Sequence, residues 1–159
     1  RAEEDSDRSI LTDMNSVLRK VLADQHHDIE SLRASIRIDT LPPAYLTDTQ
    51  AYQIWANLIS NALHYFKPGT NPRIHARKKK KTRRYFVKDH GIGIDPRFHS
   101  DIFKIFTKFH PHPQATGIGL AVVQKIIEKN EGKLSVASAP GKGACFYFSL
   151  PDERESTIS

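Results

Sequence analysis

The sequence predicts an α/β sandwich, in which helices pack on one sheet. Helical periodicity of apolar residues occurs in three segments, which begin near Thr12, Thr49 and Thr116. Five short segments have the pattern typical of strands, namely 35–39, 73–77, 84–88, 134–138 and 144–150. The length of 159 residues suits one domain. We therefore expect one domain over residues 12–151, with a linker-like stub at 1–11 and a polar tail at 152–159.

Composition favours a soluble protein of a reducing compartment. The chain has no apolar run near 18 residues and no signal-like start. The single Cys145 excludes an intrachain disulfide framework. We expect a cytoplasmic domain that makes no direct membrane contact, although a parent protein with a membrane anchor is compatible with this sequence.

The first helix is expected to begin at Thr12 or Asp13, because either residue can serve as an N-cap. His26 and His27 near its end are interpreted as surface residues. The apolar positions of this helix recur at helical spacing and are Met14, Val17, Leu18, Val21 and Leu22.

The helix expected over 49–66 is the segment around which the domain is organised. Thr47 and Gln50 predict a capping box at its start. Its apolar face comprises Tyr52, Trp55, Ile59, Ala62, Leu63 and Phe66. The opposite stripe is uncharged and comprises Gln50, Gln53, Asn57, Asn61 and His64. A solvated helix face normally carries Lys and Glu, which form helices better than Asn. The stripe therefore lines a pocket or forms a polar surface.

A run of basic residues, RKKKKTRR at 77–84, supplies much of the net charge of +6. Such a run can contact nucleic acid or anionic lipid. Because it lies between two strand-like segments and contains no aromatic residue, we interpret it as a charged hairpin tip.

Six of the eight glycines form three GxG pairs, at 91/93, 117/119 and 141/143. The first pair follows Asp89, which can accept a hydrogen bond from an amine. The second pair opens a helix, where free N–H groups and the helix dipole favour an anion. The third lies in the turn between the last two strands. Each pair alone is a weak signal, but their order after the amide-striped helix is specific.

Two segments between the first and second pairs complete the pattern. Residues 102–109 (IFKIFTKF) are expected to form a short helix docked on the core. Residues 110–116 (HPHPQAT) form a Pro-rich loop whose two histidines have no acid or cysteine beside them, so a metal site there is disfavoured.

Together these motifs resemble the catalytic and ATP-binding domain of sensor histidine kinases, in the ATPase superfamily shared with DNA gyrase, mismatch-repair proteins and certain chaperones. NLISNALHY is similar to the N box and DHGIGI to the first glycine box. IFKIFTKF resembles the phenylalanine box, TGIGLAVV the second glycine box and GKGACFYFSLP the third. The sequences of the phenylalanine box and the second glycine box are most similar to those of the phytochrome-like and hybrid branch of these kinases. The resemblance implies a mixed, mostly antiparallel sheet covered on one face by three helices, with nucleotide between the helices and a lid.

The resemblance also implies ATP and Mg²⁺ as cofactors. Asn57 and Asn61 would offer side-chain oxygens to Mg²⁺ and its water, as suits a hard cation. Asp89 would accept a hydrogen bond from the adenine amine and so select ATP over GTP. The implied catalytic residues are Gln53, Asn57 and Lys108. The implied nucleotide-binding residues are Asn57, Asn61, His64, Tyr65, Asp89, Gly91, Gly93, Ile94, Lys108, Thr116, Gly117, Ile118, Gly119 and Leu120.

Four positions depart from the family pattern. Gln53 replaces the usual Glu, which is the general base in hydrolysing relatives and orients the acceptor histidine in many kinases. His64 replaces a Lys or Arg, so its charge depends on pH. Ala115 and Ala144 replace a glycine and a hydroxyl residue. A degenerate nucleotide-binding switch is therefore the alternative to a kinase domain, and a hydrolysing ATPase is disfavoured because Gln cannot take a proton.

A kinase of this kind needs an acceptor histidine on a two-helix dimerisation hairpin, and the residues before Asn57 are too few to form one. The expected function is to present the γ-phosphate of Mg-ATP to a histidine outside this chain. The expected partners are ATP, the dimerisation and phosphoacceptor domain of a parent kinase, and a downstream response regulator, with no nucleic acid.

Overall fold

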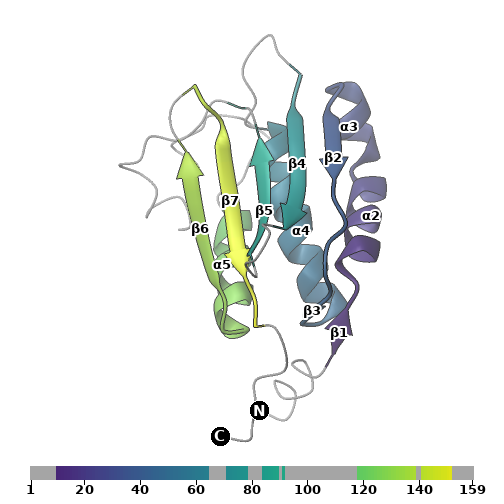
Figure 1. The fold of residues 1–159 in the computed structure, drawn as a ribbon. Coiled ribbons are helices and arrows are strands. Elements are labelled where there is room, and N and C mark those ends of the chain that lie inside the picture. The colour runs from purple at the N-terminus through teal and green to yellow at the C-terminus, as the bar shows by residue number, and fades with distance from the viewer. Residues whose placement is uncertain are drawn as a thin grey trace, which may run out of the picture.

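The computed structural model describes residues 10–64, 71–78, 84–89, 91, 118–138 and 141–151. Figure 1 shows a sheet with helices on one of its faces, which confirms the predicted α/β sandwich. The elements in chain order are β1 (Leu11–Thr12), α2 (Met14–Asp24), α3 (His26–Ser31), β2 (Ser35–Ile38), β3 (Ala44–Tyr45), α4 (Asp48–His64), β4 (Arg73–Lys78), β5 (Arg84–Asp89), α5 (Ile118–Lys129), β6 (Lys133–Ser138) and β7 (Ala144–Ser149).

The main sheet is mixed, as expected. Its five strands have the order β2-β4-β5-β7-β6, in which β2 and β4 are parallel and the other pairs are antiparallel. Lys78 of β4 pairs with Tyr85 of β5, so the basic run links two paired strands as predicted. A small sheet of β1 and β3, which the sequence did not indicate, pairs Leu11 with Tyr45.

Helix α2 begins as expected, at Asp13. The Asp13 carboxylate accepts hydrogen bonds from the backbone N–H groups of Asn15, at 2.9 Å, and Ser16, at 3.4 Å. The chain then turns into the separate short helix α3, where the sequence predicted only the end of the first helix. His26 and His27 are exposed there, which confirms them as surface residues.

Helix α4 is the centre of the helical layer. Its capping box is present, since the Gln50 N–H donates to Thr47 Oγ1 at 3.0 Å and the Thr47 N–H donates to Gln50 Oε1 at 3.2 Å. Trp55 is fully buried against Tyr85 and Phe148, with ring centroids 6.0 and 5.3 Å away. The buried face is wider than predicted, because α4 packs on α2, α5 and the sheet.

A left-handed residue and a close backbone contact end α5. The left-handed residue after the helix is Glu131, with φ of 63°, and not a glycine. The Gly132 N–H then bonds the carbonyl of Ile127 at 2.8 Å, as in a Schellman motif. Gly132 is required for space, because a Cβ on it would lie 2.0 Å from the Ser149 carbonyl oxygen. This contact fixes the end of α5 against the end of β7.

Candidate functional site

The predicted site residues that the structure describes lie toward one end of the sandwich. Figure 1 shows the C-terminal ends of α4 and β5, the start of α5 and the start of β7 at this end. The arrangement follows from the antiparallel pairing, since Lys88 of β5 pairs with Cys145 near the start of β7. The end of α5 lies against Ser149 at the opposite end, so α5 must begin beside the site.

The amide stripe of α4 passes from solvent into the protein. Gln53 is exposed and Asn57 is half-buried. Asn61 is only 9% exposed, and its side-chain amide makes no hydrogen bond to any residue that the structure describes. Among the described residues, the fully buried side-chain polar atoms without a partner do not include those of Asn61, so its amide remains accessible to water or a ligand. The stripe therefore runs from an exposed amide to a largely buried one, and its role in lining a ligand pocket stays a prediction.

Asn57 connects α4 to the start of α5. Its Nδ2 donates to the backbone carbonyl of Gln53 at 2.8 Å, which fixes the orientation of the amide. Its Oδ1 faces Gly119, where an added Cβ would lie only 2.7 Å from that oxygen. Because only glycine allows this approach, α5 can begin directly against the amide stripe. Leu120, the next residue, is buried in the core beneath.

Asp89 ends β5 as a buried carboxyl group, 5% exposed. Its Oδ1 accepts hydrogen bonds from the N–H groups of Gly91 at 2.8 Å and Ala144 at 3.2 Å. Its Oδ2 has no hydrogen-bond partner among the described residues. Burial raises the pKa of Asp89 to about 6, although the two N–H donors lower it. The site thus contains a carboxyl group with one oxygen that the described residues leave available to accept a hydrogen bond.

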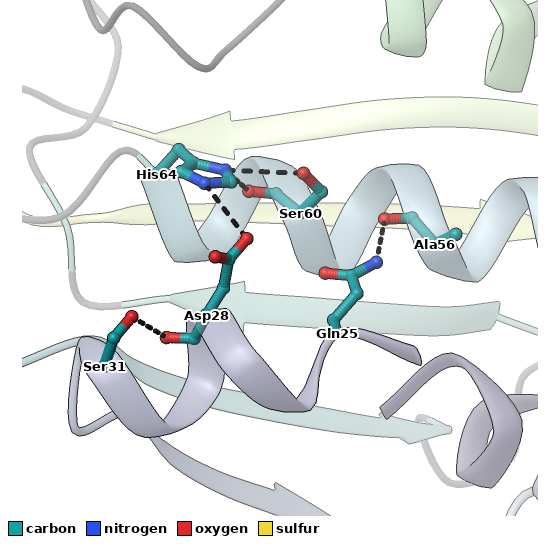
Figure 2. A network of polar contacts seen from close by, with 6 residues as sticks. All are labelled: Gln25, Asp28, Ser31, Ala56, Ser60 and His64. Atoms are coloured by element: carbon teal, nitrogen blue, oxygen red, sulfur yellow. Dashed lines mark hydrogen bonds and ion pairs between the residues drawn. The ribbon is translucent and has the colours of Figure 1, made fainter. Parts of the chain in front are cut away.

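His64 is buried at the end of α4 and contacts α3, as Figure 2 shows. Its Nδ1 lies 2.7 Å from the Ser60 carbonyl oxygen. Its Nε2 lies 3.7 Å from Asp28 Oδ2, which is an ion-pair distance and too long for a hydrogen bond. Sequence reasoning missed Asp28 and Ser60, because a contact between α3 and α4 leaves no local pattern. The expected role of His64 near phosphates stays a prediction.

The remaining predicted residues divide into two groups. Gly91 is buried beside Asp89, and Ile118 opens α5. Those that lie outside the described residues are Tyr65, Gly93, Ile94, Lys108, Thr116 and Gly117, together with the phenylalanine box and the lid.

The arrangement suits a nucleotide. A free carboxylate oxygen can accept from an amine, and the start of a helix packed against amide oxygens can hold phosphate. Within the described ranges, no group of three or more His, Cys, Asp or Glu side chains could hold a metal ion. Side-chain amide oxygens are ligands of the type that Mg²⁺ accepts, and the expectation that Asn57 and Asn61 hold this ion stays a prediction.

Comparison with known proteins decides the family. Residues 47–154 match the family model described as histidine kinase-, DNA gyrase B- and HSP90-like ATPase. The chain belongs to this family of ATPases. The match begins at the capping box of α4 and extends beyond β7, so it contains every predicted site residue.

Proteins similar to this ATPase domain include phytochromes and sensor histidine kinases. Cyanobacterial phytochrome A of Nostoc sp. is 39% identical over 145 residues, which cover 89% of this chain and 19% of that protein. The chain thus spans about a fifth of the relative's length. The mycobacterial sensor histidine kinase MprB shares the fold, with a TM-score of 0.75 at 20% identity over 91% of this chain and 99% of that one. Full-length ShkA in complex with AMPPNP has a TM-score of 0.71 at 25% identity, covering 89% and 30%. The resemblance to the phytochrome-like branch is confirmed.

Among the described residues, no helix is long and apolar enough to cross a bilayer.

Proposed function

We propose that this domain binds ATP with Mg²⁺ and presents the γ-phosphate to a histidine on a separate dimerisation domain. The observation that carries the proposal is Asp89, a buried carboxyl group whose Oδ2 has no hydrogen-bond partner among the described residues. Burying a carboxylate is costly unless its oxygens are paired. An amine donor from adenine supplies the missing partner. The complex of ShkA with AMPPNP shows that a protein of this fold holds such a nucleotide.

Each residue of the site then has a defined task. Asp89 accepts a hydrogen bond from the exocyclic amine of adenine. Guanine has a carbonyl oxygen at that position, so the Asp89 carboxylate and this oxygen would both be acceptors and could not bond. Gly119 brings the first N–H groups of α5 toward the phosphates. Asn57 and Asn61 hold Mg²⁺ and its water, and the ion supplies charge neutralisation when it is bound. The protein's own contribution is positioning, which is most of the catalysis in phosphoryl transfer.

The partners of the whole protein follow from the same proposal. The domain acts on the phosphoacceptor domain of a parent kinase, and the phosphoryl group passes from there to a response regulator. A cytoplasmic location follows, because ATP is supplied there.

A transfer assay tests this proposal. The chain is mixed with radiolabelled ATP, Mg²⁺ and a dimerisation domain that carries its acceptor histidine. We expect labelling of that histidine. We expect Gln53→Glu to increase the rate by about 100-fold, the lower end of what a positioned general base contributes. The affinity for ATP should not change, because Gln53 is exposed at the outer end of the stripe.

The control is Gln124→Glu, which makes the same chemical change on α5. An acceptor that stays unlabelled with every variant, while ATP binds normally, would leave a nucleotide-binding switch in place of a kinase domain.

A further inference from the structure

The face of the main sheet opposite the helices has its own chemistry. In Figure 1 this face has no helix upon it among the described elements. Along β5 the side chains alternate, with Tyr85 and Val87 buried in the core and Arg84, Phe86 and Lys88 on the other face. The same alternation brings Arg77 of β4 and Cys145 and Tyr147 of β7 to that face.

Basic and aromatic side chains meet there in register. Phe86 pairs with Arg77 on one side and with Tyr147 on the other. The Arg77 guanidinium lies 4.7 Å from the Phe86 ring centroid, and the Arg84 guanidinium lies 5.5 Å from that of Tyr147. With Cys145, these four residues line a cavity of about 260 Å³. We refer to these five residues as the basic–aromatic pocket.

The charge around the basic–aromatic pocket has one sign. The residues of β4, β5, β6 and β7 that share its face include no acid, and their cations include Arg73, Lys88 and Lys133. The carboxylate of Asp39 lies at the far edge, after β2, and is already paired with Arg37 at 3.5 Å and His75 at 3.1 Å. A sheet face whose described residues carry several cations and no acid attracts anionic partners.

We propose that the basic–aromatic pocket binds an acidic segment of polypeptide, whose Asp or Glu carboxylates pair with Arg77 and Arg84. A guanidinium matches a carboxylate with two parallel hydrogen bonds, and a flat aromatic side chain beside it holds the fork in place. The proposal does not depend on ATP binding, because the pocket lies on the face opposite the helices that carry the amide stripe. The proposal also gives a role to Arg77 and Arg84, the first and last residues of the basic run.

The geometry favours polypeptide over nucleic acid. A base would stack on Phe86 or Tyr147, but each of these rings already has a guanidinium over it. The cavity of about 260 Å³ lies below the roughly 300–1,000 Å³ of pockets that enclose larger ligands. It therefore admits the carboxylate end of a side chain more readily than a base with its sugar.

Fluorescence anisotropy tests the proposal with a labelled peptide of alternating Glu and Gly, and with oligothymidylate of equal charge, at one fixed salt concentration. We expect the peptide to bind, and the Arg77→Gln/Arg84→Gln variant to bind it at least about tenfold more weakly. The matched control is Arg19→Gln/Lys129→Gln, which removes the same charge from exposed positions on α2 and α5. It should change the affinity less than twofold.

A second readout locates the binding. Cys145 is the only cysteine, so a thiol reagent reports directly on the basic–aromatic pocket, and the peptide should slow its modification. The Arg77→Lys/Arg84→Lys variant keeps the positive charge but cannot form two parallel hydrogen bonds to one carboxylate. Its affinity for the peptide should lie between that of wild type and that of Arg77→Gln/Arg84→Gln. The proposal is overturned if the peptide does not bind, if both glutamine double variants bind it equally, or if oligothymidylate binds more tightly and protects Cys145 better.

Discussion

Asp89→Asn should make the domain more stable at neutral pH and, at the same time, weaken ATP binding by about 100-fold. Loss of a hydrogen bond to a charged group costs about 1.5–3 kcal/mol, and each 1.4 kcal/mol is tenfold in affinity. The new side-chain amide would also oppose the adenine amine. The two N–H groups of Gly91 and Ala144 can still donate to the asparagine oxygen, so the variant keeps the local structure.

The gain in stability follows from the raised pKa of Asp89. The folded-state pKa of Asp89, about 6, exceeds the ordinary pKa of 3.8 for an aspartate, so ionisation of this carboxyl group opposes folding. Protonated Asp89 makes its full contribution to the free energy of unfolding below about pH 4. This contribution is lost as the pH rises through 6. The difference of about 2.2 pH units corresponds to roughly 3 kcal/mol at pH 7.5. Urea unfolding at pH 4 and pH 7.5 measures it.

Asp39→Asn is the matched control. A hydrogen bond from His75 lowers the pKa of Asp39, so this substitution should not stabilise the domain, and it should leave the affinity for ATP unchanged. An Asp89→Asn variant that is less stable than wild type at pH 7.5, or that binds ATP normally, would show that Asp89 is a structural residue and not the acceptor for adenine.

Gly119→Ala is expected to weaken nucleotide binding by about 30-fold with little loss of stability. Its Cβ would lie 2.7 Å from Asn57 Oδ1, the end of a side chain that can rotate away. Rotation breaks the bond from Nδ2 to the Gln53 carbonyl and moves the oxygen from its place. Ala is also favoured over Gly in a helix by up to about 1 kcal/mol, which offsets the clash. Calorimetric titration and thermal unfolding separate the two effects.

A double-mutant cycle tests whether the effect passes through Asn57. Asn57→Ala removes the oxygen that the new methyl group would meet, so Gly119→Ala should cost much less in that background. Additive losses would contradict the proposed contact, because they would show that Gly119 acts on the nucleotide without Asn57.

Local signals in the sequence were sufficient for most elements of the fold. The capping box of Thr47 and Gln50 lies within three residues, and the start of α4 was correct to one residue. The N-cap of α2 at Asp13 is equally local. The strands were found because alternation of burial is a property of each strand by itself. The fold class follows from these local signals, whereas the mixed sheet and the family were predicted correctly from the resemblance that the ordered motifs carry.

The tertiary details were beyond the same reasoning. The separate helix α3 and the approach of Asp28 to His64 depend on how two helices pack. The left-handed residue after α5 is Glu131. The glycine stands one residue later, at Gly132, because the Ser149 carbonyl oxygen leaves no room for a Cβ there. Both the position of α3 against α4 and the end of α5 are determined by tertiary packing. Neither feature produces a recognisable pattern in a few neighbouring residues of the sequence.

The most direct test of a nucleotide site on the amide stripe is calorimetric titration of ATP, with and without Mg²⁺, against the wild-type chain and Asn61→Ala. Because the Asn61 side chain makes no hydrogen bond to the described residues, its removal should leave the fold intact. We predict saturable binding that requires Mg²⁺ in the wild type and is at least about tenfold weaker in the variant. Absence of binding by the wild-type chain at millimolar ATP, or equal binding by the variant, would contradict the account.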